Sequence, residues 1–421
     1  MRPPFPPVPR PRAAALGAIG VLVALVAPAA ACGQSAAPAD TGRAPAAAPR
    51  PDTGAARPAP ARADTTRPIA PRPDTARPDT ARPDGARRDS VGGAALVAAP
   101  RPDSTRGDTA RREPPPPRAF NRAAVLAEPA FPVNARSGTA ALLHVQVLLD
   151  AAGFSPGMLD GRWGENVRVA LFAFRESLGM DPDVEAVDAA AYAELRRRAG
   201  ARPTVTTYVL DAADLRGPFR PVPSEVAEKA RVACLCYESL LERLSERFHA
   251  TPALLRALNP GVDFAAARAG DALTVPNTWR LAPRGRVARV VVDKAAGGVR
   301  GLAADGRVLF WLPATVGSAA MPSPHGTLRV ESVTVGPHYR WDPAVLRDVS
   351  RRAPVRVLPP GPNNLVGSVW VALSRPHVGI HGTPDPERVG YSASHGCVRL
   401  TNWDALWFSR LARAGLPVIF E

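Results

Sequence analysis

Cysteine is scarce in this chain: four occur among 421 residues, namely Cys32, Cys234, Cys236 and Cys397. So few cysteines exclude a scaffold held together by disulfides. Cys234 and Cys236 are separated by one residue, a spacing that strains a direct disulfide and cannot by itself supply the four ligands of a structural zinc site. We therefore predict that they are small buried residues on one face of a strand, with a redox role as the alternative.

The chain also lacks the features of a nucleic-acid-binding protein. Its net charge is +15 and its pI about 10.9, which is compatible with nucleic acid, an anionic membrane or an anionic polymer as partner. No zinc-finger spacing, recognition helix or interleaved aromatic residues accompany the charge, and arginines spread through a proline-rich segment are one source of it. We predict no nucleic-acid partner.

The N-terminus has the pattern of an export signal. Three arginines within the first twelve residues precede an apolar run from Ala13 to Ala31, and small residues lead up to Cys32. A basic region, an apolar core and a small-residue cleavage point direct a chain out of the cytoplasm. The stretch "APAAAC" resembles a bacterial lipobox, although Ala29 stands where that motif usually has leucine.

The lipobox resemblance implies that residues 1–32 are a signal peptide ending at a lipidated Cys32. The protein would then be anchored to a membrane in the periplasm or cell envelope. Ordinary cleavage and an uncleaved membrane span are the alternatives, because about 20 apolar residues can cross a bilayer.

Residues 33–118 are rich in Ala, Pro, Arg, Asp and Thr and include an imperfect five-residue repeat from Arg72 to Ser90. This composition cannot bury enough apolar surface to offset the loss of chain entropy on folding. We predict a disordered tether that lets the domains behind it reach away from a membrane anchor.

A helical pattern begins after the tether. Leu142, Val145 and Leu148 fall at helical spacing, the turn "GMLDGRWG" follows, and residues 169–174 mark a second helix. The stretches "AAGF", "LDGRWG" and "FAFRESLGM" resemble the peptidoglycan-binding domain 1 family over residues 137–199. The resemblance implies a small three-helix module that binds the cell wall.

The next region, residues 205–280, mixes strand and helix patterns. In "LSERFHATPALLRALNPG" two helices break at Thr251, which can cap the second helix, and Pro252 suits its first position. Together with the strand-like "AGDALTVP", this stretch resembles a LysM module, which implies an α+β fold that binds N-acetylglucosamine polymers. We interpret His249 as a partly buried histidine and not as a metal ligand.

The last region, residues 286–421, consists of short β-rich segments separated by Gly, Pro and Asn turns, a pattern typical of a sandwich or barrel. One helix interrupts it, with a capping-box-like start at Thr401 and Asp404 and an end at Gly415, before a final strand "LPVIFE". The sequence therefore predicts a multidomain protein. A mainly-β sandwich or barrel follows a three-helix module, a LysM-like α+β module and a disordered tether rich in Pro and Ala.

The stretch "HGTPDPERVGYSASHGCVRL" contains the candidate chemistry. A thiol is a poor nucleophile at neutral pH without a base or a positive environment, and His381 and His395 are the nearby bases for Cys397. His381 can reach the thiol only if the loop between them folds back, which its two prolines and two glycines favour. Gly396 permits a sharp turn, so that neighbouring amides could form an oxyanion hole for acyl transfer through a thioester.

Two other interpretations of this stretch stay open on residue types alone. Two histidines and one cysteine are too few for a closed zinc site but would suit a catalytic one. A buried cysteine beside hydrogen-bonded histidines is the purely structural alternative. We predict no metal and no cofactor.

"HGT", followed after ten residues by "SHGCVRL", resembles the signature of YkuD-type L,D-transpeptidases, and the likeness extends over residues 286–421. The resemblance implies that Cys397 is the nucleophile, that His381 accepts and donates the proton, and that the Gly382 carbonyl orients the imidazole. The other positions of the motif would supply oxyanion amides or position the site: Ser394, His395, Gly396 and Arg399.

The implied activity is formation of 3→3 peptidoglycan cross-links through a Cys397 thioester, with release of the terminal D-alanine of a tetrapeptide stem. Water as acceptor would make an L,D-carboxypeptidase, and a lipoprotein lysine would make an anchoring enzyme. A papain-like or NlpC-like peptidase is disfavoured because there the cysteine precedes its histidine. The alternative from another class is a non-catalytic lipoprotein that tethers the envelope to peptidoglycan. The implied partners are stem peptides, glycan and a membrane.

Overall fold

The computed structural model describes residues 120–421 except 318–320, 345–349, 351, 393 and 395. The predicted signal peptide, the lipidation site at Cys32 and the tether up to residue 118 therefore lie outside the described residues. The described residues belong to one compact unit, Pro100–Glu421. Within them, no helix is long and apolar enough to cross a membrane.

The region predicted as a three-helix module is helical. Three of its helices pack around a core that includes Leu149, Phe154, Phe174 and Leu195, all fully buried. The turn after the first of them is organised by Gln146, whose side chain accepts from the Gly161 amide at 2.8 Å. The helices of this part of the chain are α1 Arg122–Leu126, α2 Thr139–Ala151, α3 Glu165–Glu176 and α4 Ala189–Ala199.

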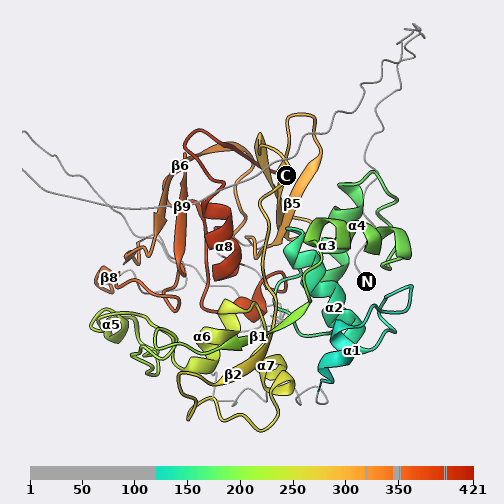
Figure 1. Ribbon diagram of the computed structural model, residues 1–421. Coiled ribbons are helices and arrows are strands. Elements are labelled where there is room, and N and C mark those ends of the chain that lie inside the picture. The colour runs from blue at the N-terminus through green and yellow to red at the C-terminus, as the bar shows by residue number, and fades with distance from the viewer. Residues whose placement is uncertain (1–119, 318–320, 345–349, 351, 393, 395) are drawn as a thin grey trace, which may run out of the picture. The chain divides into compact units, whose positions relative to one another are not determined.

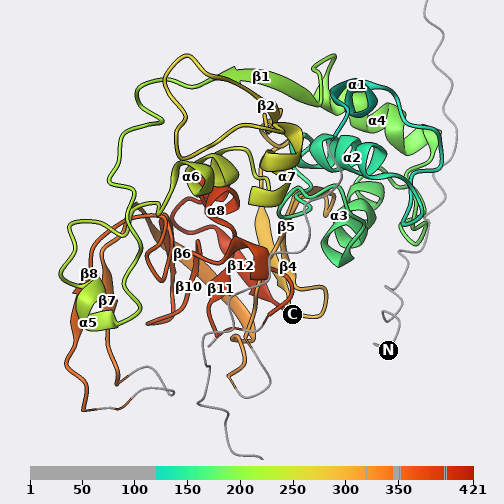
Figure 2. The same ribbon diagram turned by 90° about the horizontal axis from the view of Figure 1, so that it is seen from below.

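The following region has the order strand, helices, strand. Strands β1 (Val205–Val209) and β2 (Ala272–Pro276) pair antiparallel, and three helices lie between them in the sequence. The predicted cap at Thr251 is present, because its hydroxyl accepts from the Leu254 amide at 3.1 Å. The helices are α5 Val226–Lys229, α6 Leu240–Arg247 and α7 Pro252–Leu258. Figure 2 shows α6 beside α8 of the last region, in agreement with their contacts.

Cys234 and Cys236 form a disulfide, so the prediction of two reduced residues on a strand face is wrong. The segment is irregular and not a strand, and the Cα atoms of the two cysteines are 5.2 Å apart. Two such residues in a strand would lie about 6.6 Å apart, whereas 5.2 Å is within the ordinary range for a disulfide. Leu235 between them is buried in a small core.

The last region is mainly β, as predicted. Its main sheet has eight strands in the order β11-β10-β9-β6-β12-β3-β4-β5, and β7 and β8 form a separate hairpin. The strands are β3 Arg289–Asp293, β4 Gly298–Leu302, β5 Val308–Pro313, β6 Gly326–Val335, β7 Tyr339–Trp341, β8 Arg356–Leu358, β9 Val369–Leu373, β10 Gly379–His381, β11 Val398–Arg399 and β12 Pro417–Phe420.

The two layers of this fold are halves of one continuous sheet. Strand β6 joins them, because its first part pairs with β12 and its second part, after a bulge at Val330, pairs with β9. Apolar residues of both halves, such as Phe310 and Val371, belong to one core. Helix α8 (Asn402–Ser409) lies between β9 and β5 in Figure 1 and contributes Phe408 to that core.

A buried ion-pair network joins the three regions. Arg280, in the segment after β2, donates to both Asp150 at the end of α2 and Asp404 on α8, the latter at 2.6 Å. All three side chains are at most 4% exposed. Asp150 also pairs with the His249 ring at 3.0 Å, and Ser155 donates to Asp404 at 3.1 Å.

Two sequence expectations are refined by this network. Asp404 does not complete a capping box with its side chain, since its carboxylate faces Arg280 and Ser155, although its amide donates to the Thr401 hydroxyl as predicted. His249 is buried against Trp403, with the rings stacked 5.1 Å apart. Burial by itself would raise the pKa of Asp150, but Arg280 and His249 outweigh it and hold that pKa far below its ordinary value.

We expect Arg280→Met to lower the free energy of unfolding by about 3–5 kcal/mol, because two fully buried carboxylates would lose their cation. Urea denaturation followed by circular dichroism measures this. The control is Arg168→Met, which removes a partly exposed pair with Glu165 and should cost less than about 1 kcal/mol. Equal effects of the two substitutions would contradict the role given to Arg280.

Candidate active site

The candidate site is built on three adjacent strands. His381 ends β10, where it pairs with Trp370 of β9 on one side and with Arg399 of β11 on the other. Paired residues of neighbouring strands share a face of the sheet, so these three side chains form one row. The Trp370 and His381 rings are stacked, with centroids 5.3 Å apart.

Cys397 lies one residue before β11, and the parallel register with β10 places it level with Gly379. Cys397 itself lies in a bend, so strand alternation does not fix the direction of its side chain. The Arg399 charge acts on both Cys397 and His381. The chain between His381 and Cys397 returns to the same sheet edge through a short 3₁₀ helix, Pro386–Arg388. The register therefore places His381 and Cys397 at the ends of neighbouring strands, and their roles as base and nucleophile stay predictions.

His381 has the environment of a neutral base. Its side chain is 4% exposed, and its Nδ1 lies 2.7 Å from the Gly382 carbonyl oxygen. Because a carbonyl only accepts, Nδ1 carries the proton and Nε2 keeps its lone pair. Burial lowers the pKa of His381 to about 4, with a smaller contribution in the same direction from the Arg399 charge. The imidazole is therefore neutral at physiological pH.

Cys397 is a partly accessible free thiol. Its Sγ lies 3.5 Å from the His377 carbonyl oxygen, to which the thiol can donate. Burial raises the pKa of the thiol, against a backbone hydrogen bond from Gly379 and the positive charge of Arg399, which lower it. The resting pair is consequently a thiol and a neutral imidazole and not a thiolate–imidazolium ion pair.

The turn before the thiol is held by hydroxyl groups. The Ser394 hydroxyl donates to the Cys397 carbonyl at 2.5 Å and accepts from the Gly396 amide at 3.2 Å. Gly396 has φ +111°, a conformation that side chains rarely adopt, and its carbonyl accepts from the Ser323 hydroxyl at 2.9 Å. The Gly396 amide is therefore engaged by Ser394 in this state, and His395 lies outside the described residues.

Arg399 has a structural and an electrostatic contribution. Its backbone amide and carbonyl both bond to Thr315 at 2.9 Å, which fixes β11 beside the segment after β5. Its charge acts on His381, Cys397 and Tyr339. The Nε atom of Arg399 is buried and has no hydrogen-bond partner among the described residues.

Tyr339 of β7 was not found by sequence reasoning. Its pKa is raised by burial and further by the Cys397 charge, which places the phenol within electrostatic reach of the thiol. The hairpin that carries it packs on the disulfide segment, because Leu235 contacts Trp341 and Leu358 in one small core. The Leu235 amide also donates to the Pro360 carbonyl at 3.0 Å. A tyrosine so far from the motif in sequence gives no local signal.

Asn402, the first residue of α8, supports the base from behind. A Cβ on Gly382 would come within 2.2 Å of its Oδ1, so the Gly382 backbone lies directly against this amide. Asn402 Oδ1 accepts from the Ser368 amide at 2.9 Å, and its Nδ2 donates to Glu246 of α6 at 2.7 Å. Gly382, whose carbonyl accepts from His381, is thus packed against Asn402, and Asn402 is hydrogen-bonded to Glu246 of the preceding region.

Known proteins resemble the last region of the chain. The family described as the L,D-transpeptidase catalytic domain, YkuD, matches residues 288–420. Residues 288–420 are an L,D-transpeptidase catalytic domain. The resemblance stated for this region is confirmed, whereas those to peptidoglycan-binding domain 1 and LysM stay predictions.

The alignment with this chain covers a different share of each relative's length. YkuD of Bacillus licheniformis is 26% identical over 178 residues, 42% of this chain and 91% of its own. YbiS of Escherichia coli is 29% identical over 167 residues, 38% of this chain and 53% of its own. Both carry the name L,D-transpeptidase.

Solved structures of L,D-transpeptidases are also similar to part of this chain. One from Mycobacterium smegmatis is 23% identical, with a TM-score of 0.27 over 38% of this chain and 80% of that one. One from Xylanimonas cellulosilytica is 17% identical, with a TM-score of 0.31 over 70% of this chain and 100% of that one. In the part of the chain that the structure describes, no group of three His, Cys, Asp or Glu side chains is arranged to hold a metal ion.

We expect Asn402→Ala to raise the pKa of His381 from about 4 towards its ordinary value of 6.5, because loss of the side chain behind Gly382 admits water to the imidazole. An NMR titration of the ring protons measures this. Asn277→Ala is the matched control, since among the described residues that side chain donates to the Pro203 carbonyl, away from His381. An unchanged titration of His381 in Asn402→Ala would contradict the positioning role.

Proposed function

We propose that this protein is a peptidoglycan L,D-transpeptidase that forms 3→3 cross-links through a thioester on Cys397. The proposal is supported by the register of β10 and β11, which sets Cys397 at the start of the strand beside His381, within a region that matches the L,D-transpeptidase family. In this proposal Gly382 orients the base, Ser394 and Gly396 shape the turn, and Arg399 tunes the charge at the site.

The first half-reaction starts from two neutral groups. As the Cys397 sulfur attacks the carbonyl carbon at the L-centre of the donor's diamino acid, the thiol proton passes to Nε2 of His381. The tetrahedral intermediate then collapses, and the imidazolium returns the proton to the departing amine of D-alanine. The product is a thioester between Cys397 and the shortened stem.

The second half-reaction reverses these roles. The side-chain amine of a neighbouring stem attacks the thioester, His381 accepts a proton from that amine, and the Cys397 sulfur departs and is protonated again. The Gly396 amide is engaged by Ser394 in the resting state. We therefore assign the oxyanion contact in both steps to the Cys397 amide.

The location of the enzyme follows from the N-terminal sequence. The basic start, the apolar run and Cys32 support export and a lipid anchor in the envelope. The tether would give the catalytic domain its reach, and the two regions before it would hold glycan or stem peptides near the site. These roles rest on sequence resemblance.

We expect purified protein incubated with disaccharide-tetrapeptides to yield a cross-linked dimer with loss of D-alanine, detected by mass spectrometry. Cys397→Ser and His381→Gln should each reduce the product at least about 100-fold, since they remove the nucleophile or the base. His377→Asn is the control, because His377 contributes only its carbonyl to the thiol and asparagine tolerates its φ of 62°. Tripeptide alone would identify water as the acceptor. A product formed equally by Cys397→Ser would refute the mechanism.

The pH dependence should carry the signature of the buried base. kcat/KM reports ionisations of the free enzyme, and His381 must be neutral to accept the proton. We expect activity to be retained as pH falls through 6.5 and to be lost only as it approaches about 4, where His381 protonates. Release of D-alanine between pH 3.5 and 8, with circular dichroism to exclude unfolding, measures the profile. An acid limb near 6.5 would contradict this environment.

A further inference from the structure

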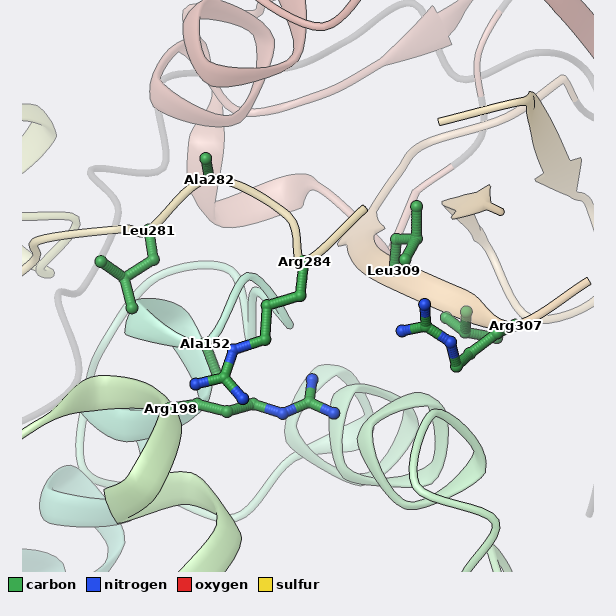
Figure 3. A pocket seen from close by; sticks show the side chains of 8 residues that line it. Ala152, Arg198, Leu281, Ala282, Arg284, Arg307 and Leu309 are labelled. Carbon is green, nitrogen blue, oxygen red and sulfur yellow. The ribbon is translucent and has the colours of Figure 1, made fainter. Parts of the chain in front are cut away.

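A concave site lies where the first helical region, the connecting segment after β2 and the start of β5 meet. It encloses about 340 Å³, open solvent at its mouth included. Three arginines from three separate segments line it: Arg198 of α4, Arg284 of the connecting segment and Arg307 just before β5. Figure 3 shows the head groups of Arg198 and Arg284 close together, with Arg307 directed to the same space.

The site is separate from the candidate active site. Arg307 precedes the first residue of β5, whereas Thr315, which bonds to Arg399, follows its last residue. The six-residue strand therefore separates the arginine cluster from the segment that contacts the active site. No step proposed for Cys397 uses these residues.

The carboxylates nearby do not neutralise the cluster. Glu194 is engaged by Arg197 through hydrogen bonds of 2.5–3.0 Å. Among the residues that the structure describes, Arg307 has a single ion-pair contact, a long and exposed one to Asp305 at 3.9 Å. The Glu194 charge acts on both Arg198 and Arg284, but within the described residues neither arginine forms an ion pair with a carboxylate. Arg198 donates to the Ser177 hydroxyl at 3.1 Å, and Arg284 donates to the Arg197 carbonyl at 3.5 Å.

Arg198 is in the least favourable position of the three. Its guanidinium lies over the Phe154 and Phe174 rings, 5.6 and 5.0 Å from their centroids, and its Nε is buried without a hydrogen-bond partner among the described residues. Burial first, and then the like charge of Arg284, lower the pKa of Arg198 to about 10. Stacking on aromatic rings offsets only part of the cost of a half-buried cation.

We propose that this pocket binds an oxyanion, a carboxylate or phosphate group, held between Arg198, Arg284 and Arg307. Planar guanidinium groups match the oxygens of both anions with paired hydrogen bonds, and an anion would supply the counter-charge that the pocket lacks. Because the three arginines come from the helical region, the connecting segment and the catalytic domain, the bound anion would also tie these segments together. The site is independent of the chemistry proposed for Cys397.

The test uses the full chain carrying Cys397→Ala, so that no ligand is consumed, and titrates it with inorganic phosphate by calorimetry at constant ionic strength set with sodium chloride. We expect one site per chain with a dissociation constant of about 1 mM or tighter and a rise in melting temperature with phosphate. Arg284→Gln with Arg307→Gln should weaken binding at least 10-fold. Both side chains are exposed, and circular dichroism checks that the fold is kept.

The control removes the same charge elsewhere. Arg136 and Arg220 are exposed and outside the pocket, so Arg136→Gln with Arg220→Gln should leave phosphate binding within about 2-fold of the parent, because distant exposed charges are screened. A second arm titrates a stem tetrapeptide, whose carboxylates are the other source of an oxyanion. Phosphate binding that requires Arg284 and Arg307 supports a phosphate ligand, and tetrapeptide binding with the same requirement supports a carboxylate ligand. Absence of saturable binding in both arms, or equal loss in the control, overturns the proposal.

Discussion

The structure depends on one buried cation, Arg280, placed between the carboxylates of Asp150 and Asp404. Burying a carboxylate without a partner is so costly that each of these two aspartates requires the arginine. Such a pair adds little net stability compared with apolar residues of the same shape. The ion pairs instead fix the arrangement of the segments that carry them, because a displacement would leave a buried charge unpaired. Helix α2, the segment after β2 and helix α8 consequently have one mutual arrangement in which all the charges are satisfied.

Helix α8 carries this constraint to the active site. Asp404 and Trp403 face the preceding regions, where they contact Arg280 and His249, while Phe408 enters the core between the half-sheets. Asn402 at the start of the same helix lies against Gly382 and bonds to Glu246. The orientation of the His381 imidazole is thus set by a helix whose own position is fixed from the other side. A substitution in α6 or at Arg280 can therefore alter the orientation of the His381 imidazole from outside the candidate active site.

The sequence predicted the parts of this site that lie close together along the chain. His381, Gly382, Gly396 and Cys397 belong to one motif, and alternating apolar residues separated by turns indicated the mainly-β domain around it. The Thr251 cap and the helix start at Thr401 were also visible, because caps are local.

Long-range features were not predictable from one sequence. The disulfide between Cys234 and Cys236 depends on the irregular course of a segment that pairs with Pro360, more than a hundred residues later. Tyr339, Asn402 and Arg280 act through partners in other regions, so no spacing reveals them. Their residue types are also ambiguous, since an arginine or asparagine in a solvated turn has the same local pattern.

The burial that fixes the site also decides how its chemistry must begin. It lowers the pKa of His381 and raises that of Cys397, so both shifts disfavour proton transfer before substrate arrives. Arg399 stabilises a thiolate but destabilises an imidazolium, and therefore cannot by itself reverse this balance. The imidazolium becomes favourable when negative charge develops on the attacked carbonyl oxygen nearby. In the proposed reaction, proton transfer and carbon–sulfur bond formation would therefore occur together, and the thiol would stay protonated and less reactive until a stem peptide binds.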